Sequence, residues 1–155
     1  MNLLKTIFLI LIAALILSCK KKHNEPEPPA RSTLPVSGKL YGKSYTIASC
    51  KANKRVDYYQ EEGYEIFLSS GKNYGCGTAD ENFHIIIRTP RKIGKFSEHY
   101  AILSDPANSD YIMFTDGNLF EITSISGNTI KGYMKVSSPT TNSDLEGVFE
   151  ATICN

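Results

Sequence analysis

Few residues of this chain combine the type and the spacing that catalysis requires. Ser97-Glu98-His99 contains the residue types of a hydrolase triad, but adjacency in sequence does not give triad geometry, and the chain has no Gly-x-Ser-x-Gly turn. A nucleophilic cysteine needs a lowered pKa and a neighbouring base, and nothing in the sequence places His84 or His99 beside a cysteine. We therefore expect no catalytic residues and no enzymatic activity.

Metal and cofactor sites have little more support. The histidines lack metal-ligand spacing and the cysteines form no C-x-x-C pair, so we expect no metal site and no cofactor. Asp105, Asn108 and Asp110 carry enough oxygen atoms to hold Ca²⁺, but they lack the spacing of an EF-hand. A turn at Asp105-Pro106 between two strands is the favoured interpretation.

The cysteine with the clearest predicted chemistry is Cys19. Lys5 supplies a basic region, residues 7–17 supply an apolar run, and Ile16-Leu17-Ser18-Cys19 ends this run with a small residue before the cysteine. This is the layout of a bacterial lipoprotein signal. The apolar run is well short of the ~20 residues that a membrane-spanning helix needs. We therefore expect residues 1–18 to be a signal peptide and Cys19 to carry acyl chains such as palmitate, which anchor the protein to a membrane.

Residues 19–35 have the composition of a tether. They are charged, rich in proline and almost without apolar side chains, so they bury too little surface to offset the entropy of ordering them. Leu17-Ser18-Cys19-Lys20-Lys21-Lys22 with the acidic, proline-rich spacer resembles the start of many Bacteroidota-type lipoproteins. That resemblance implies a lipid anchor in the outer membrane of the cell envelope, with the domain displayed on the cell surface.

The other three cysteines are Cys50, Cys76 and Cys154, an odd number for an oxidising compartment. One disulfide and one spare thiol are therefore expected. Cys76 lies in a glycine-rich loop and Cys154 lies near the C-terminus, so a bond between them would hold a loop to a chain end that would otherwise fray. We favour Cys76 with Cys154, keep Cys50 as the alternative partner of either one, and leave open a chain without a bridge.

The elements that would position any site are predicted to be strands. Residues 36–155 have the length and composition of one globular domain, with β-branched and aromatic residues in alternation between Gly, Asn and Asp. In residues 130–136 and 145–153 the alternation is clearest, with Ile130, Met134 and Val136 on an inward face and with Leu145, Phe149 and Ile153 on another. Gly127-Asn128 is predicted to be a two-residue hairpin turn.

About eight short strands are expected, at residues 36–40, 45–51, 64–69, 83–88, 111–115, 119–125, 130–136 and 145–153. Only Arg55 to Glu62 is a candidate for a short helix. This pattern predicts an all-β domain, an antiparallel meander that closes into a barrel or a two-sheet sandwich. Segments such as Tyr64-Glu65-Ile66-Phe67-Leu68 and Gly147-Val148-Phe149-Glu150-Ala151 resemble the strands of small Bacteroidota lipoprotein domains of unknown function. The resemblance implies a compact β domain without catalytic residues.

Tyrosines are the remaining candidates for binding. Tyr58, Tyr59, Tyr74, Tyr100 and Tyr111 are expected in loops or at strand ends, where their rings could stack on a sugar or contact a protein. Coverage of half-exposed sheet faces is the alternative and favoured explanation of these tyrosines.

The function favoured by these observations is binding without catalysis. The excess positive charge lies before residue 36, so the domain has no basic surface for nucleic acid. We expect an envelope lipoprotein whose β domain binds a small ligand, a glycan or an envelope protein. A structural or assembly partner of an envelope complex is the second hypothesis, and an envelope hydrolase is the weakest.

Overall fold

The computed structural model describes residues 30–56, 62–72, 75–76, 84–96, 101–105, 108–114 and 118–154. At 56, 84, 105 and 108–114 it describes the backbone only. Cys19, Tyr58, Tyr59, Tyr74 and Tyr100 lie outside the described residues, as do residues 97–100 with the Ser97-Glu98-His99 sequence. Arg31–Asn155 form one compact unit.

The described part of this unit consists of strands and connections, and it contains no helix. Its eleven strands are β1 Ser37–Leu40, β2 Lys43–Thr46, β3 Ser49–Val56, β4 Glu62–Ser69, β5 His84–Pro90, β6 Gly94–Phe96, β7 Ala101–Asp105, β8 Asn108–Phe114, β9 Leu119–Ser126, β10 Thr129–Ser138 and β11 Ser143–Cys154. The all-β prediction is therefore confirmed, with more strands than the eight expected.

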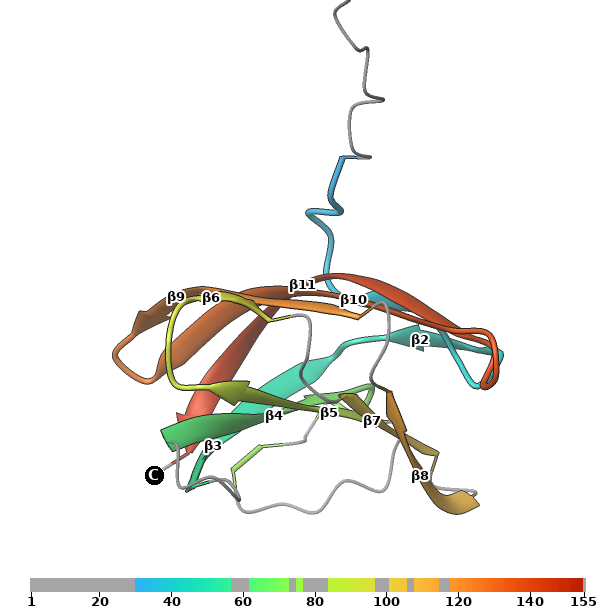
Figure 1. Ribbon diagram of the computed structural model, residues 1–155, viewed down its shortest axis with the longest axis horizontal. Helices are drawn as coiled ribbons and strands as arrows, with labels where there is room; N and C mark the ends of the chain where they lie inside the picture. Colours follow the sequence, from blue (N-terminus) through green and yellow to red (C-terminus); the bar gives the residue numbers. More distant parts are fainter. Residues whose placement is uncertain are drawn as a thin grey trace, which may run out of the picture. The chain divides into compact units, whose positions relative to one another are not determined.

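The strands form one mixed sheet that folds over itself into two layers (Figure 1). Its order is β6-β9-β10-β11-β3-β4-β5-β7-β8, and the β1–β2 hairpin is attached through β1 to β11. The first layer contains β6, β9, β10 and β11 with the hairpin, and the second contains β3, β4, β5, β7 and β8. The sheet does not close into a barrel, since β6 and β8 end the order. The fold is thus of the sandwich type, and the predicted meander is found in β9, β10 and β11.

The long strand β11 joins the two layers because it changes partner along its length. It pairs with β10 on one side from Ser143 to Thr152, while on the other side it pairs first with β1 and then, in parallel, with β3 from Thr152 to Cys154. The Gly127-Asn128 hairpin is confirmed by the pairing of Ser126 with Thr129 and by a φ of 55° at Gly127.

Two sequence predictions were wrong in detail. Residues 45–51 do not form one strand, because the chain changes partner there: the Ile47 N–H donates to Val36 O, beside β1, and the Ala48 N–H donates to Ser69 O, at the end of β4. The proposed helix from Arg55 to Glu62 is also wrong at both ends, since Arg55 lies in β3 and Glu62 begins β4. Residues 57–61 lie outside the described part. The strands β6 and β7 were not predicted.

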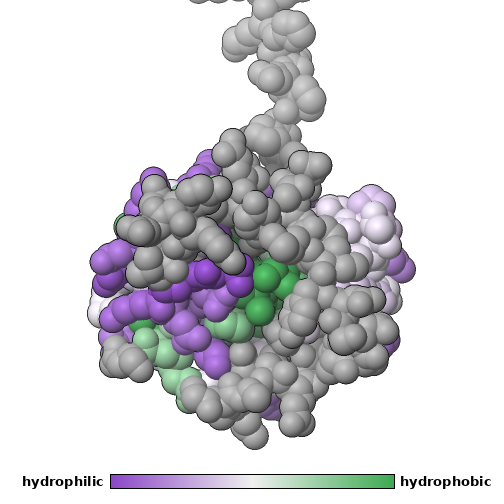
Figure 2. Space-filling view, turned by 60° about the horizontal axis from the view of Figure 1, so that its bottom comes forward, coloured by the Kyte–Doolittle hydropathy of each residue, from purple (hydrophilic) through white to green (hydrophobic). Residues whose placement is uncertain are grey.

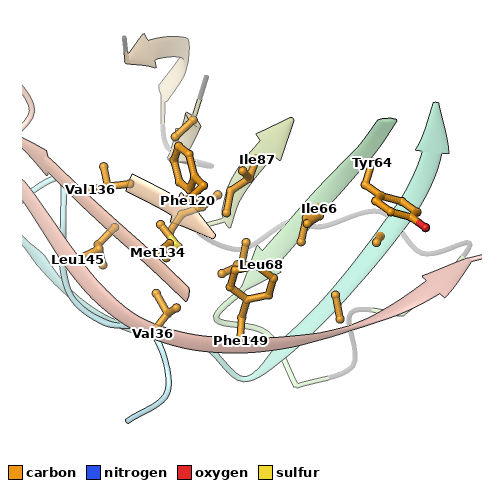
Figure 3. Close-up of a cluster of buried hydrophobic side chains, with 14 of the residues drawn as sticks. Val36, Tyr64, Ile66, Leu68, Ile87, Phe120, Met134, Val136, Leu145 and Phe149 are labelled. Carbon is orange, nitrogen blue, oxygen red and sulfur yellow. The ribbon is translucent and has the colours of Figure 1, made fainter. Parts of the chain in front are cut away.

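The core lies between the two layers and is built from alternate residues of the strands (Figure 3). The predicted inward faces of β10 and β11 are confirmed, because Ile130, Met134, Val136, Leu145, Phe149 and Ile153 are all buried. Tyr64, Ile66, Leu68 and Ile87 face them from the second layer. Burial of each large apolar side chain contributes about 1.5–3 kcal/mol.

Candidate binding site

A groove opens where β11 passes from one partner to the other. Pro35 forms a parallel bridge with Val148, and the pairing with β3 begins at Thr152, so Glu150 lies between these two contacts. The groove has a volume of about 500 Å³. It is lined by Pro35, Ile47, Ala48, Ser49, Cys50, Thr123, Lys131, Gly132, Val148, Phe149 and Glu150.

The local sequence explains the shape of this groove. Gly132 lies opposite Phe149 in the β10–β11 pair, and a Cβ atom at Gly132 would stand 2.3 Å from Cζ of the Phe149 ring. Glycine is therefore required for the ring to lie where it does. Thr123 is an extra residue in β9 at the register shift beside Gly132, and its hydroxyl donates to Lys131 O at 3.2 Å.

The groove combines an apolar floor with a polar rim, which is the usual chemistry of a small-molecule site. Phe149, Ile47 and Val148 supply apolar surface, while the ion pair of Lys131 with Glu150, 3.0 Å long, lies at the rim. Both charged groups are exposed, so their mutual attraction is weak and either one can turn to a ligand.

Cys50 contributes a thiol to this groove, but not a nucleophile. It packs against the core as the one free cysteine among the described residues. Burial raises the pKa of the Cys50 thiol well above its ordinary value, so the thiol stays protonated. Its contribution is that of a small apolar side chain.

A second cluster lies on the outer face of the same layer. The Tyr133 hydroxyl donates to Glu146 Oε1 at 2.9 Å, Lys135 Nζ lies 3.1 Å from Glu146 Oε2, and the Ser32 N–H donates to Glu146 Oε1 at 3.1 Å. Arg31 covers the Tyr133 ring at 5.0 Å and pairs with Glu121. The bond from Ser32 first, then those from Tyr133 and Lys135, hold the pKa of Glu146 below its usual range.

Tyr133 makes a contact that the sequence did not predict. Tyr133 does point away from the core, but Arg31 packs over its ring and it is buried. Burial, and next the bond to Glu146, raise the pKa of Tyr133 to about 12. No local sequence pattern could predict this contact, because Arg31 and Tyr133 are far apart in the chain.

The outer face of the second layer carries a different set of charges. Glu65 Oε1 accepts from Arg88 Nε at 2.9 Å and from Arg55 at 3.1 Å, so one carboxylate lies between two cations. At the beginning of β4, and not on this outer face, Arg91 pairs with Glu62 at 2.8 Å and donates from Nε to the hydroxyl of the core residue Tyr64 at 3.2 Å. Figure 2, which brings the lower side of Figure 1 forward, shows hydrophilic residues beside a smaller hydrophobic area.

A disulfide joins Cys76 to Cys154, as favoured from the sequence. Lys51, buried on β3, donates from Nζ to Gly75 O at 3.2 Å, next to this disulfide. The loop residues 75 and 76 are thus held to the sheet by one covalent and one polar contact.

The remaining predicted site residues are not brought together in the described part of the chain. Tyr111 lies in β8, where only the backbone is described, and Asp105 pairs with Asn108 across the β7–β8 connection. Among residues with described side chains, no cluster of three His, Cys, Asp or Glu is arranged to hold a metal ion. Within the same part of the chain, no helix has the length and apolar character needed to cross a membrane.

No family model, curated protein or solved structure matches this chain.

Proposed function

We propose that this protein is a lipoprotein of the bacterial cell envelope, anchored through Cys19 in the outer membrane, whose β domain binds a ligand or protein partner without catalysis. The observation that carries the binding function is the groove beside Glu150, with its apolar floor and charged rim. The lipoprotein signal ending at Cys19 supports the anchor.

Groove geometry favours a small ligand with an apolar body and a polar end. The floor offers the Phe149 ring and the side chain of Ile47, and the rim offers Lys131 and Glu150 to a polar group. Catalysis has weaker support, because the thiol that lines the groove is held protonated by burial.

Ligand binding is tested by thermal unfolding of a mature chain that begins at residue 20. The screen includes amphiphiles, oligosaccharides and ions. A ligand at a hundred times its Kd adds about 2.7 kcal/mol and raises the Tm by several degrees. We expect Thr123→Phe, which fills the groove, to abolish that rise. Thr46→Phe, at an exposed position of β2 outside the groove, is the matched control and should leave the rise intact. Equal loss in both variants would place the ligand elsewhere.

Lipidation is tested separately, by the mass of the N-terminal peptide of protein purified from bacterial membranes. We expect acyl chains on Cys19 and none on residues that follow it. Cys19→Ala protein should carry no acyl chains. Wild-type protein from the membrane fraction whose Cys19 lacks acyl chains would disprove the proposed anchor.

A further inference from the structure

The first residues of the compact unit are bound to the outer face of its first layer. We call Arg31–Pro35 the leading segment. Its backbone is fixed at Val148, whose N–H donates to Leu34 O at 2.9 Å and whose carbonyl accepts from Val36 N–H at 3.0 Å. At its other end, Arg31 pairs with Glu121 of β9. The leading segment therefore enters the compact unit at this layer (Figure 1).

The length of chain before the leading segment limits how far this layer can lie from a lipid anchor. Residues 20–30 separate Cys19 from Arg31. At full extension such a segment reaches roughly 40 Å, at ~3.3–3.6 Å per residue. The domain is thus kept near the bilayer, where even a weak surface attraction acts at an effective concentration of about millimolar.

Two exposed apolar residues of the described part lie together on the same layer, and a third lies where the chain enters β6. Leu34 is 68% exposed and Val148 is 37% exposed, and the two are joined by the backbone bond of the leading segment. Ile93, 60% exposed, directly precedes Gly94 of β6, which pairs with β9. These three are all the exposed large hydrophobic residues that the described side chains include.

In two of the three described ion pairs of this layer the cation is more exposed than its carboxylate, while Lys131 and Glu150 of the third are exposed about equally, at 58% and 61%. Arg31 is 44% exposed while its partner Glu121 is 19% exposed, and Lys135 is 45% exposed while Glu146 is 31% exposed. Lys95 of β6 and Lys131 of β10 are exposed as well. Long cationic side chains beside exposed apolar ones are the combination that rests on anionic headgroups.

We infer that the outer face of β6, β9, β10 and β11, which we call the anchor face, lies against the anionic surface of the membrane that holds Cys19. This rests on the proposed lipid anchor. Leu34, Val148 and Ile93 contact the interface, and Arg31, Lys95 and Lys131 contact lipid headgroups. The second layer then faces away from the bilayer. The groove shares Pro35, Val148 and Lys131 with the anchor face, so amphiphiles from the bilayer are its first candidate ligands.

The absence of tryptophan from the chain allows a direct test. Mature lipidated Leu34→Trp protein is placed in vesicles of phosphatidylcholine with phosphatidylglycerol, some carrying brominated acyl chains as quenchers. We expect its emission to move to shorter wavelength and to be quenched. The matched control is Phe67→Trp, on the outer face of β4 in the second layer, which should be neither shifted nor quenched. In the Leu34→Trp background, Lys95→Glu should weaken the quenching severalfold, while Lys72→Glu, exposed beyond β4, should not.

The outcomes separate this inference from the proposed anchor. Flotation of the same samples with vesicles reports the anchor, and failure to float would remove both the anchor and the inference. Protein that floats while Leu34→Trp and Phe67→Trp behave alike would overturn the inference alone. A wavelength shift that follows protein concentration and not lipid would assign the anchor face to a second copy of the chain, which also overturns it.

Discussion

At the scale of single residues, one carboxylate, Glu146, binds several polar groups at once. It accepts hydrogen bonds from the Ser32 backbone and from Tyr133, and it pairs with Lys135. Three donors on one carboxylate stabilise its charged form, which is why its pKa is low. Glu146 also connects β11 to the leading segment through the Ser32 N–H, so its negative charge helps to hold that segment on the domain.

Removal of the tyrosine hydroxyl tests this arrangement. We expect Tyr133→Phe to lower the free energy of unfolding by about 1–3 kcal/mol at neutral pH, since a hydrogen bond to a charged group is lost. Because the folded pKa of Glu146 is depressed, this stabilisation is present above the ordinary carboxyl pKa and is lost as the pH falls through the folded pKa. Urea unfolding at several pH values should therefore show the difference between the two proteins shrink in acid. A constant difference would mean that Tyr133 acts through packing alone.

The same residue predicts a late step in alkaline titration. The folded protein keeps the Tyr133 proton up to a pKa of about 12, whereas the unfolded chain releases it near 10. Stability should consequently fall as the pH rises between these values. Absorbance of tyrosinate should show one tyrosine that ionises after the exposed ones, and Tyr133→Phe should remove that step. A titration identical in both proteins would contradict the burial of this hydroxyl.

At the scale of elements, glycine in the strands has two different causes. Gly132 is required by the space beside it, since a Cβ atom would lie 2.5 Å from Glu121 O as well as against the Phe149 ring. Gly127 is required by its conformation, because its φ is 55° and nothing lies within 4 Å of its Cβ position. Gly132 thus allows β9 and β10 to pack closely beside the Phe149 ring at the groove floor, and Gly127 allows the chain to turn between β9 and β10.

These causes predict unequal effects of the same substitution. Gly127→Ala should cost about 1–2 kcal/mol, the strain of an L-residue in the left-handed region. Gly132→Ala should cost about 3 kcal/mol or more, because both a side chain and a strand must move. Urea unfolding of the two variants measures the contrast. Equal urea midpoints of the two variants would show that the Phe149 ring makes room for a side chain at position 132.

The same scale separates what the sequence could predict from what it could not. Alternation in β10 and β11 correctly predicted the buried faces, because each pattern lies within one strand and depends on one side being covered. The division at Ile47 and Ala48 could not be predicted, since it depends on partners at Val36 and Ser69. The groove was not predicted for a similar reason: its lining comes from five separate parts of the chain, and no short motif contains it.

At the scale of the whole molecule, β11 holds the sandwich together. It contacts β10, β1 and β3, and thereby joins both layers. Its last residue, Cys154, is bonded to Cys76, 78 positions earlier in the chain. The disulfide thus ties the end of this strand to the segment that follows β4, and it closes a loop that includes β5 to β11.

Loss of this bond should weaken the fold as a whole. A closed loop of this length restricts the unfolded chain strongly, and we expect the Cys76→Ser, Cys154→Ser double variant to lose about 2–4 kcal/mol of unfolding free energy. The Tm should fall by several degrees or more. Reductant should lower the midpoint of the wild-type protein and of Cys50→Ser, which keeps the bond, and should leave the double variant unchanged. If reductant does not lower the midpoint of the wild-type protein under unfolding conditions, the disulfide contributes nothing to stability. The bond from Lys51 to Gly75 would then be the restraint on this loop.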